Sequence, residues 1–203
     1  MHTSTAIRAA TAADLAGIAR TIASAFADDP LLSWLLPNPA DRERRIEAFY
    51  ARALPAMWEG HRGEMLTTDG QTAVAIWRAP NEWKTPARTA VRTGVASLRS
   101  LGVPATMRVA KVLGALEKRH PSDEHWYLDA LGTDPAYQRR GIGSAMLEPV
   151  LERCDEQGLP AYLETQKLDN VAFYRHFGFE VREELEIVVG GPRAWTMWRE
   201  PQS

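Results

Sequence analysis

The sequence predicts an α+β fold in which helices pack against one mixed β-sheet. Three observations lead to this prediction. Helical patterns occupy much of the first 120 residues, an Asp-Gly turn joins two short extended runs within that part, and strands alternate with helices after Pro121. We expect a single domain over residues 1–203, because no linker or internal repeat divides the chain.

The N-terminal part predicts a short strand and two helices. A strand at Ile7 is followed by Thr11–Asp14, whose spacing is that of a capping box, and by apolar residues at helical spacing over residues 15–28. Residues 41–58 predict a second amphipathic helix, which Pro55 kinks or ends early.

The segment between these two helices allows two interpretations. Leu31–Leu36 is apolar and is followed by Pro37. It is either a mobile lid over an acceptor pocket or a turn between helices, and the sequence does not separate the two.

The next segments predict a hairpin and a broken helix. Residues 64–68 and 72–77 are extended runs joined by Asp69-Gly70, which is a good hairpin signal. Residues 85–119 have helical periodicity that is interrupted near Gly102, so we expect two helices there.

The C-terminal part supplies most of the predicted sheet. We expect strands at residues 125–132, 159–163, 179–189 and 193–199, with helices at residues 141–157 and 170–177.

Composition excludes several classes of protein. The single cysteine, Cys154, excludes an intramolecular disulfide and a thiolate zinc site, and the histidines lack the spacing of metal ligands, so we expect no metal. The chain has neither a signal-peptide pattern nor an apolar run long enough to span a bilayer. We therefore expect a cytoplasmic protein that has no membrane partner.

A formal charge of −2 conceals a basic segment. Residues 84–119 contain eight basic side chains and one acidic side chain, a net charge of +7 that leaves −9 for the rest of the chain. We call these eight residues the basic stripe: Lys84, Arg88, Arg92, Arg99, Arg108, Lys111, Lys118 and Arg119. The stripe lacks the interleaved aromatic residues and glycines of common RNA-binding folds. We interpret it as a solvated helical face and expect no nucleic-acid partner.

The turn at Gln138–Ser144 is the most informative segment. It follows a predicted strand, opens a predicted helix and contains two arginines and two glycines, which suits a diphosphate. A Walker loop is excluded because its Gly-Lys-Ser/Thr string is absent. A dinucleotide fingerprint is disfavoured because Met146 stands where the third glycine belongs, although Glu164 lies near the expected ribose-binding position.

Two motifs resemble those of the GNAT acyltransferases. Gln138, Gly141 and Gly143 match the family's Gln/Arg-x-x-Gly-x-Gly/Ala loop, and Asn170, Tyr174 and Gly178-Phe179 look like its second signature. The resemblance implies a mixed, mostly antiparallel sheet flanked by helices on both faces, with acetyl-CoA bound by about residues 125–180. Scattered residues further resemble the puromycin N-acetyltransferase branch, among them Ala25–Asp28, Leu163–Thr165 and Gly191–Arg193.

The resemblance also implies which residues hold acetyl-CoA. The backbone of Leu131 and Thr133 is expected to pair with the pantetheine arm, and Asn170 either contributes to this site or only caps its helix. The diphosphate is expected at Gln138, Arg139, Arg140, Gly141, Ile142, Gly143 and Ser144. The basic stripe is left with at most a secondary role near the 3′-phosphate of CoA.

Tyr174 and Glu164 are the expected catalytic residues. The phenol of Tyr174 would protonate the departing thiolate, and Glu164 would take a proton from the amine or bind its cation. Asp129 and a water relay are the alternatives to Glu164 as the base. Cys154 is an unsuitable nucleophile, because neighbouring acids would raise its pKa.

These residues predict an N-acetyltransferase that acts directly on the primary amine of a small molecule, as a monomer or homodimer. The alternatives are a catalytically silent acyl-CoA-binding regulatory module and a protein-lysine acetyltransferase. Four tryptophans are each expected in the core, or else around an aromatic acceptor: Trp34, Trp58, Trp77 and Trp83.

Overall fold

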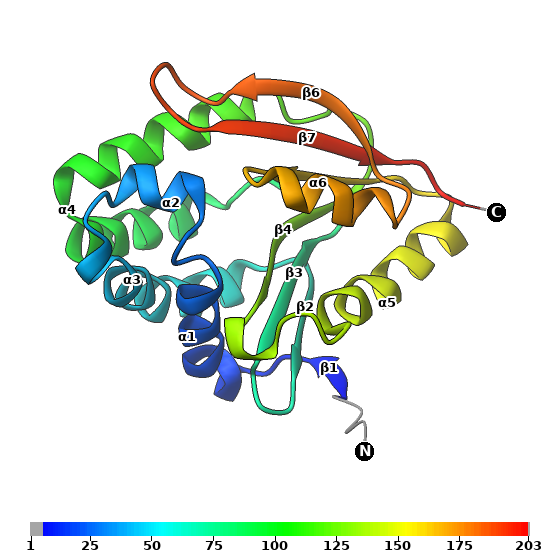
Figure 1. Cartoon of the computed structure of the whole chain (residues 1–203), viewed down its shortest axis with the longest axis horizontal. Coiled ribbons are helices and arrows are strands. Elements are labelled where there is room, and N and C mark those ends of the chain that lie inside the picture. Colours follow the sequence, from blue (N-terminus) through cyan, green and yellow to red (C-terminus); the bar gives the residue numbers. More distant parts are fainter. Residues whose placement is uncertain (1–5, 203) are drawn as a thin grey trace.

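One seven-stranded sheet organises the molecule, as the computed structural model of residues 6–202 shows (Figure 1). The strand order is β1-β2-β3-β4-β5-β7-β6, and every neighbouring pair is antiparallel except β4 and β5. The strands are β1 (Ile7–Ala9), β2 (Gly63–Thr68), β3 (Ala73–Arg78), β4 (Trp126–Thr133), β5 (Ala161–Thr165), β6 (Glu180–Glu186) and β7 (Arg193–Arg199). The predicted α+β class with a mixed, mostly antiparallel sheet is confirmed.

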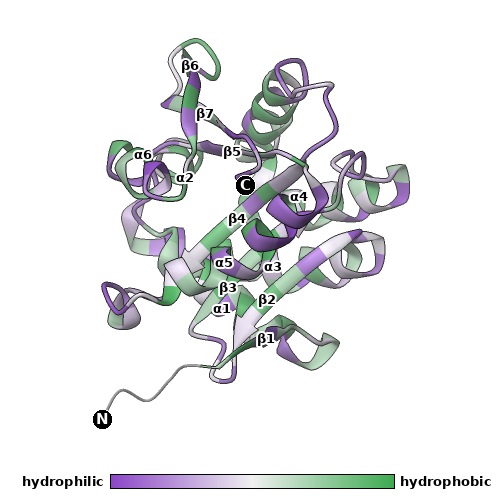
Figure 2. Cartoon of the chain, turned by 90° about the vertical axis from the view of Figure 1, so that its right-hand side faces the viewer, coloured by the Kyte–Doolittle hydropathy of each residue, from purple (hydrophilic) through white to green (hydrophobic). Residues whose placement is uncertain are grey.

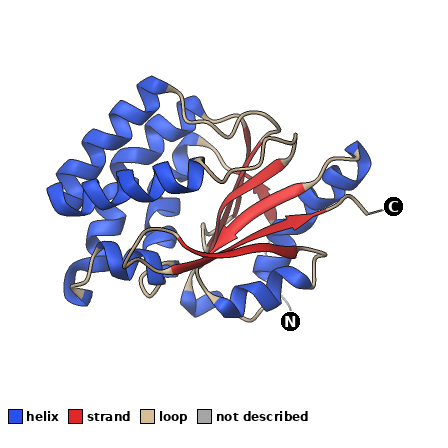
Figure 3. Cartoon of the chain, turned by 90° about the horizontal axis from the view of Figure 1, so that it is seen from above, coloured by secondary structure: helices blue, strands red, loops and turns tan. Residues whose placement is uncertain are grey.

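Helices cover both faces of this sheet (Figures 1 and 3). They are α1 (Leu15–Ala25), α2 (Pro30–Leu35), α3 (Pro39–Gly60), α4 (Ala87–Glu117), α5 (Ile142–Gln157) and α6 (Leu168–Arg175). Short 3₁₀ turns at Ala12–Asp14 and Pro135–Tyr137 precede α1 and α5.

Alternation along β3 places the two cores on opposite faces of the sheet. Ala73, Ala75 and Trp77 pack with α5 and α6, whereas Val74 and Ile76 pack with α1 and α3. The middle strands are largely hydrophobic in Figure 2, and hydrophilic residues lie mainly on the outer helices and loops. Burial on both faces explains why β3 reads as one continuous apolar run.

The parallel pair β4–β5 separates partway along its length. Pairing extends from Trp126–Ala161 to Leu128–Leu163 and then stops, although β4 continues to Thr133. Beyond this point β4 pairs with β3 alone, and β5 pairs with β7 alone. We call this divergence the fork.

Three local predictions were wrong. Leu31–Leu36 is not a turn, because residues 30–35 form α2, with Pro30 in its first turn and the Asp29 carboxylate accepting hydrogen bonds from two of its backbone N–H groups. The helix α3 continues through Pro55 to Gly60. The helix α6 begins at Leu168, so Asn170 lies inside it and is not its N-cap.

The predicted break in the long helix is confirmed. Gly102 has φ 74° and ψ 170°, which no helix accommodates, and it divides α4 into two parts. Pro104 follows in the first turn of the second part, where its missing N–H costs no helical hydrogen bond. The kink lets α4 pack along α3 with one part and reach the β6–β7 end of the sheet with the other.

No helix among residues 6–202 is both long and apolar enough to cross a membrane.

We expect Gly63→Ala to destabilise the protein by at least about 2 kcal/mol. Gly63 has φ +141°, and a Cβ atom there would lie 2.1 Å from the Trp77 carbonyl oxygen. The matched control is Gly94→Ala on α4, where nothing lies within 4 Å of the added atom and stability should change by less than about 1 kcal/mol. Urea unfolding of both variants measures the difference, and equal stabilities would contradict this account of Gly63.

Candidate active site

The Gln138–Ser144 turn presents backbone donors to solvent. Gly141 precedes α5 in the left-handed conformation (φ 77°), and Arg139 is also left-handed (φ 60°). Ala145 makes the first backbone bond of the helix, to Gly141, at 3.1 Å, and within residues 6–202 the N–H groups of residues 142–144 have no acceptor. Several free N–H groups at a helix N-terminus fit the diphosphate that the sequence predicts.

The turn borders a pocket of about 620 Å³, which we call the first pocket. Ten of the twelve predicted site residues line it, together with parts of α1 and α6: Leu131, Thr133, Gln138, Arg139, Gly141, Ile142, Gly143, Ser144, Asn170 and Tyr174. Arg140 does not line it, because its guanidinium is exposed, donates to the Ala136 carbonyl and stacks over Tyr137. Glu164 does not line it either.

Two polar side chains that line the first pocket form hydrogen bonds within the protein. The Gln138 amide donates to the Thr133 carbonyl at 3.0 Å and so closes the turn. The Asn170 amide donates to the Thr165 hydroxyl at 3.2 Å and thereby joins α6 to the end of β5. These bonds explain how both residues shape the pocket wall.

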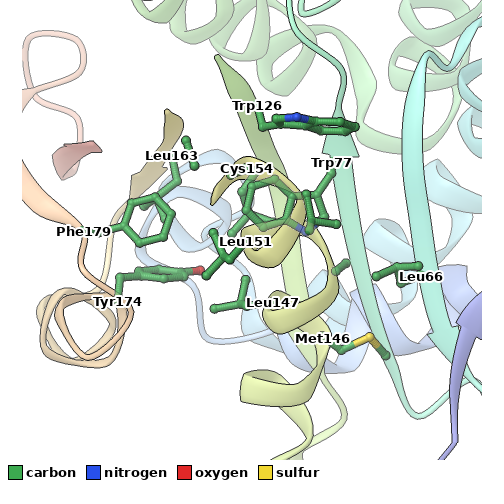
Figure 4. Close-up of a cluster of buried hydrophobic side chains, with 14 of the residues drawn as sticks. Leu66, Trp77, Trp126, Met146, Leu147, Leu151, Cys154, Leu163, Tyr174 and Phe179 are labelled. Carbon is green, nitrogen blue, oxygen red and sulfur yellow. The ribbon is translucent and has the colours of Figure 1, made fainter. Parts of the chain in front are cut away.

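Tyr174 lies between the apolar core and the first pocket. Its side chain is 6% exposed, packs edge-on against Phe179 and directs its hydroxyl toward α5 (Figure 4). Burial raises the pKa of this phenol above its ordinary value, so Tyr174 stays protonated across the physiological range. A protonated phenol at a pocket wall is a potential proton donor.

Glu164 lies on β5 just beyond the fork. It is half-buried and forms no ion pair with any residue in the described part of the chain. Burial raises its pKa to about 7, opposed by the phenols of Tyr127 and Tyr162 and assisted by the charge of Asp129. A carboxyl that titrates near neutral pH can both accept and release a proton.

Asp129 has a different environment. Both Nε and Nη2 of Arg78 contact its Oδ2, each at 2.8 Å. Asp129 and Arg78 also line a second pocket, of about 280 Å³, between the sheet and α2, α3 and α4. The first and second pockets therefore approach each other along β4, where Leu131 lines one and Asp129 the other.

An aromatic cluster that the sequence analysis missed lies beneath Glu164. The ring of His120 meets those of Tyr127 and Tyr162 at 4.9 and 5.1 Å and stacks on Trp83 at 3.9 Å. His120 and His125 share a hydrogen bond of 3.1 Å, and burial lowers the pKa of His120 to about 3. Residues 120–127 contain no motif, so only tertiary packing identifies this cluster.

The predicted aromatic acceptor pocket is not made by the tryptophans. Trp77 is fully buried, Trp34 and Trp58 pack against core clusters, and none of these three lines the first or the second pocket. Trp83 stacks on His120 instead. The aromatic rings of the second pocket are Phe49 and Tyr50.

The basic stripe is only partly a solvated face. Arg92 pairs with Glu59, and Arg108 donates to the carbonyls of Trp34 and Leu35 at the end of α2. No member of the stripe lines the first pocket.

Cys154 is fully buried, and burial raises the pKa of its thiol to about 12, which makes it unsuited to nucleophilic attack. The described residues contain no cluster of three or more histidine, cysteine or acidic side chains that could hold a metal.

We expect Glu164→Gln to stabilise the protein increasingly as pH rises from about 4.5 to 7. The raised pKa means that the folded wild type retains a proton that the unfolded chain loses, so the wild type loses stability over this interval, whereas the uncharged amide of the variant does not titrate. The gain should reach about 1–3 kcal/mol above pH 7. The control is Glu180→Gln on exposed β6. Urea titrations at several pH values measure both, and a pH-independent difference for Glu164→Gln would disprove a raised pKa.

Comparisons with known proteins agree with this geometry. Residues 74–179, just over half of the chain, match the model of the acetyltransferase (GNAT) family. An uncharacterized N-acetyltransferase of Schizosaccharomyces pombe is 24% identical over 95% of this chain and 82% of its own length.

Solved structures show the same fold. The structure of histone acetyltransferase HPA2 and related acetyltransferase from Corynebacterium glutamicum aligns with a TM-score of 0.72 and 21% identity, over 97% of this chain and 96% of that one. Arylalkylamine N-acetyltransferase 2 of Aedes aegypti aligns with a TM-score of 0.58 and 10% identity, over 97% and 99%. The fork between β4 and β5, the Gln138–Ser144 turn and the family match together identify the chain as a member of the GNAT family of N-acetyltransferases.

Proposed function

We propose that the protein transfers the acetyl group of acetyl-CoA directly to the primary amine of a small molecule. The observation that carries the proposal is the approach of two pockets along β4. The first has the features of a CoA site, and the second lies between the sheet and three helices, with the Asp129 carboxylate at its sheet end. An acceptor bound in the second pocket would present its amine at the fork, beside Glu164.

In this proposal, the residues of the chain bind, orient and move protons. The free N–H groups of residues 142–144 hold the diphosphate, and the backbone of Leu131 and Thr133 aligns the pantetheine arm. Acetyl-CoA supplies the activated acyl group as a thioester. Glu164 takes one proton from the ammonium, and the amine nitrogen bonds to the acetyl carbon as the carbon–sulfur bond breaks. Tyr174 protonates the departing sulfur, and the second proton lost by the nitrogen restores the Tyr174 phenol. The products are an amide and CoA.

Structural neighbours are consistent with a small acceptor. Two of them are an arylalkylamine N-acetyltransferase and an agmatine N-acetyltransferase. The protein-lysine alternative requires room for a peptide beside the amine, whereas the second pocket, which α2, α3 and α4 border, has a volume of only about 280 Å³. The positions of Tyr174 and Glu164 disfavour a catalytically silent module.

Membership of the puromycin branch stays a proposal, and puromycin belongs in the panel of amines that tests the acceptor.

We expect Tyr174→Phe to lower kcat by about 10²–10⁴-fold, the usual contribution of a general acid. The ring and its packing remain, so the dissociation constant of acetyl-CoA should change by less than about twofold. Thiol release from acetyl-CoA across a panel of amines measures the first effect, and calorimetry the second. Unchanged turnover of Tyr174→Phe at every pH would exclude this phenol as the proton donor.

We expect the combined variant Arg88→Gln, Arg92→Gln and Arg99→Gln to bind acetyl-CoA as the wild type does. All three side chains are exposed on α4, and none lines the first pocket. The contrasting variant is Arg139→Gln in the Gln138–Ser144 turn, which should weaken the binding of acetyl-CoA because Arg139 lines the first pocket. A larger loss in the triple variant than in Arg139→Gln would assign the 3′-phosphate of CoA to the basic stripe.

A further inference from the structure

The second pocket has an apolar body and one charged end. Leu35, Leu36, Phe49, Leu101 and Val112 are among the residues that surround its interior, and of these Leu35, Leu36, Leu101 and Val112 are nearly inaccessible to solvent. Within the described part of the chain, the only charged residues that line it belong to the Arg78–Asp129 pair. Because this pair lies on β3 and β4, the charge is confined to the end of the pocket that faces the sheet.

The Arg78–Asp129 pair leaves one carboxylate oxygen open. Both contacts from Arg78 go to Oδ2, and no donor among residues 6–202 reaches Oδ1. The Arg78 and Asp129 side chains are 12% and 25% exposed, so the pair is partly buried while Oδ1 stays accessible to a ligand. A partly buried carboxylate oxygen favours a cationic hydrogen-bond donor, and an ammonium group fits this requirement.

Three carboxyl groups surround the fork, and Arg78 is the cation that lines the second pocket beside them. The negative charges of Asp129 and Asp29 both disfavour ionisation of Tyr50, which lines the second pocket. Asp129 also disfavours ionisation of Glu164. An anionic acceptor would meet three carboxyl groups at this point, whereas a single ammonium would be stabilised by them.

We propose that the acceptor is a compact primary amine with an uncharged, apolar body, whose body occupies the second pocket and whose ammonium group binds Asp129 Oδ1. This inference rests on the proposed function and names the class of its acceptor. The volume of about 280 Å³ lies at the lower end of ligand pockets, which suits one aromatic ring or a short alkyl chain.

The same geometry disfavours two other classes of amine. A diamine would place its second ammonium among leucine and phenylalanine side chains, where it has no counter-ion. An α-amino acid would place a carboxylate beside Asp129 and Glu164, where the lining cation Arg78 is already paired with Asp129. Asp129 lies only two residues before Leu131 on one strand, about 7 Å along it, so the ammonium sits within reach of the first pocket.

The first test compares three amines with the wild-type protein. We expect kcat/KM for 2-phenylethylamine to exceed that for phenylalanine, and that for 1,4-diaminobutane, by at least about 30-fold. A lysine-containing peptide is included as the protein-substrate control. If acetyl transfer occurs but a diamine, an amino acid or the peptide is preferred, the inference is overturned and the proposed function stands. If no amine is acetylated and calorimetry with CoA present detects no binding of 2-phenylethylamine, both are overturned.

The second test locates the amine by substitution. Thr93→Phe on α4 should fill part of the second pocket and lower kcat/KM for 2-phenylethylamine by at least about tenfold, with the KM for acetyl-CoA unchanged. The matched control is Val91→Phe on the same helix, which is 67% exposed, does not line the pocket and should have no effect. Asp129→Asn should raise the KM of the amine by about 10–100-fold, as loss of a charged hydrogen bond predicts. Unchanged kinetics in Thr93→Phe would place the amine elsewhere.

Discussion

The architecture of the site depends on where the parallel pairing of β4 and β5 stops. Beyond Leu128 and Leu163, one edge of each strand has no strand partner, although the other edge pairs with β3 or β7, with Asp129 skipped at a register shift. Backbone polar groups at such an edge must find another partner. A ligand with amide groups of its own, such as pantetheine, can supply these hydrogen-bond partners. The interruption of strand pairing therefore creates the edge to which the cofactor is proposed to bind. Asp129 on β4 and Glu164 on β5 are the first residues beyond the last paired positions of these two strands, so both lie at the fork.

The two carboxyl groups at the fork differ because only one of them has a cation beside it. Arg78 from the neighbouring strand binds Asp129, whereas Glu164 faces two phenols, and burial raises its pKa to about 7. The bulge between Ile76 and Trp77 shifts the register of β3 against β4 just before Arg78. This shift leaves Asp129 without a pairing partner on β3, and its side chain is bound by Arg78. The geometry thus favours Glu164 over Asp129 as the proposed base and leaves Asp129 to bind charge.

The sequence predicts the parts of the fold that rest on local rules. The capping box at Thr11, the Asp-Gly hairpin, the break at Gly102 and the turn before α5 each depend on a few adjacent residues, and the structure confirms all four. The helix α2 was missed because a largely apolar segment of six residues is too short to define a helical period. The partner of Asp129 lies 51 residues away, and the two pockets are made by segments from all parts of the chain. Such contacts follow from tertiary packing, which a motif does not encode.

The binding of the proposed acceptor and the ionisation of Glu164 are coupled. Without the amine, burial and the negative charge of Asp129 both favour the protonated form of Glu164. A cation placed against Asp129 offsets that negative charge and lowers the pKa of Glu164. By linkage, the ammonium in turn binds more tightly to the form in which Glu164 is ionised. The amine would therefore help to generate the base that deprotonates it, which explains how a half-buried carboxyl with a pKa near 7 can serve at neutral pH.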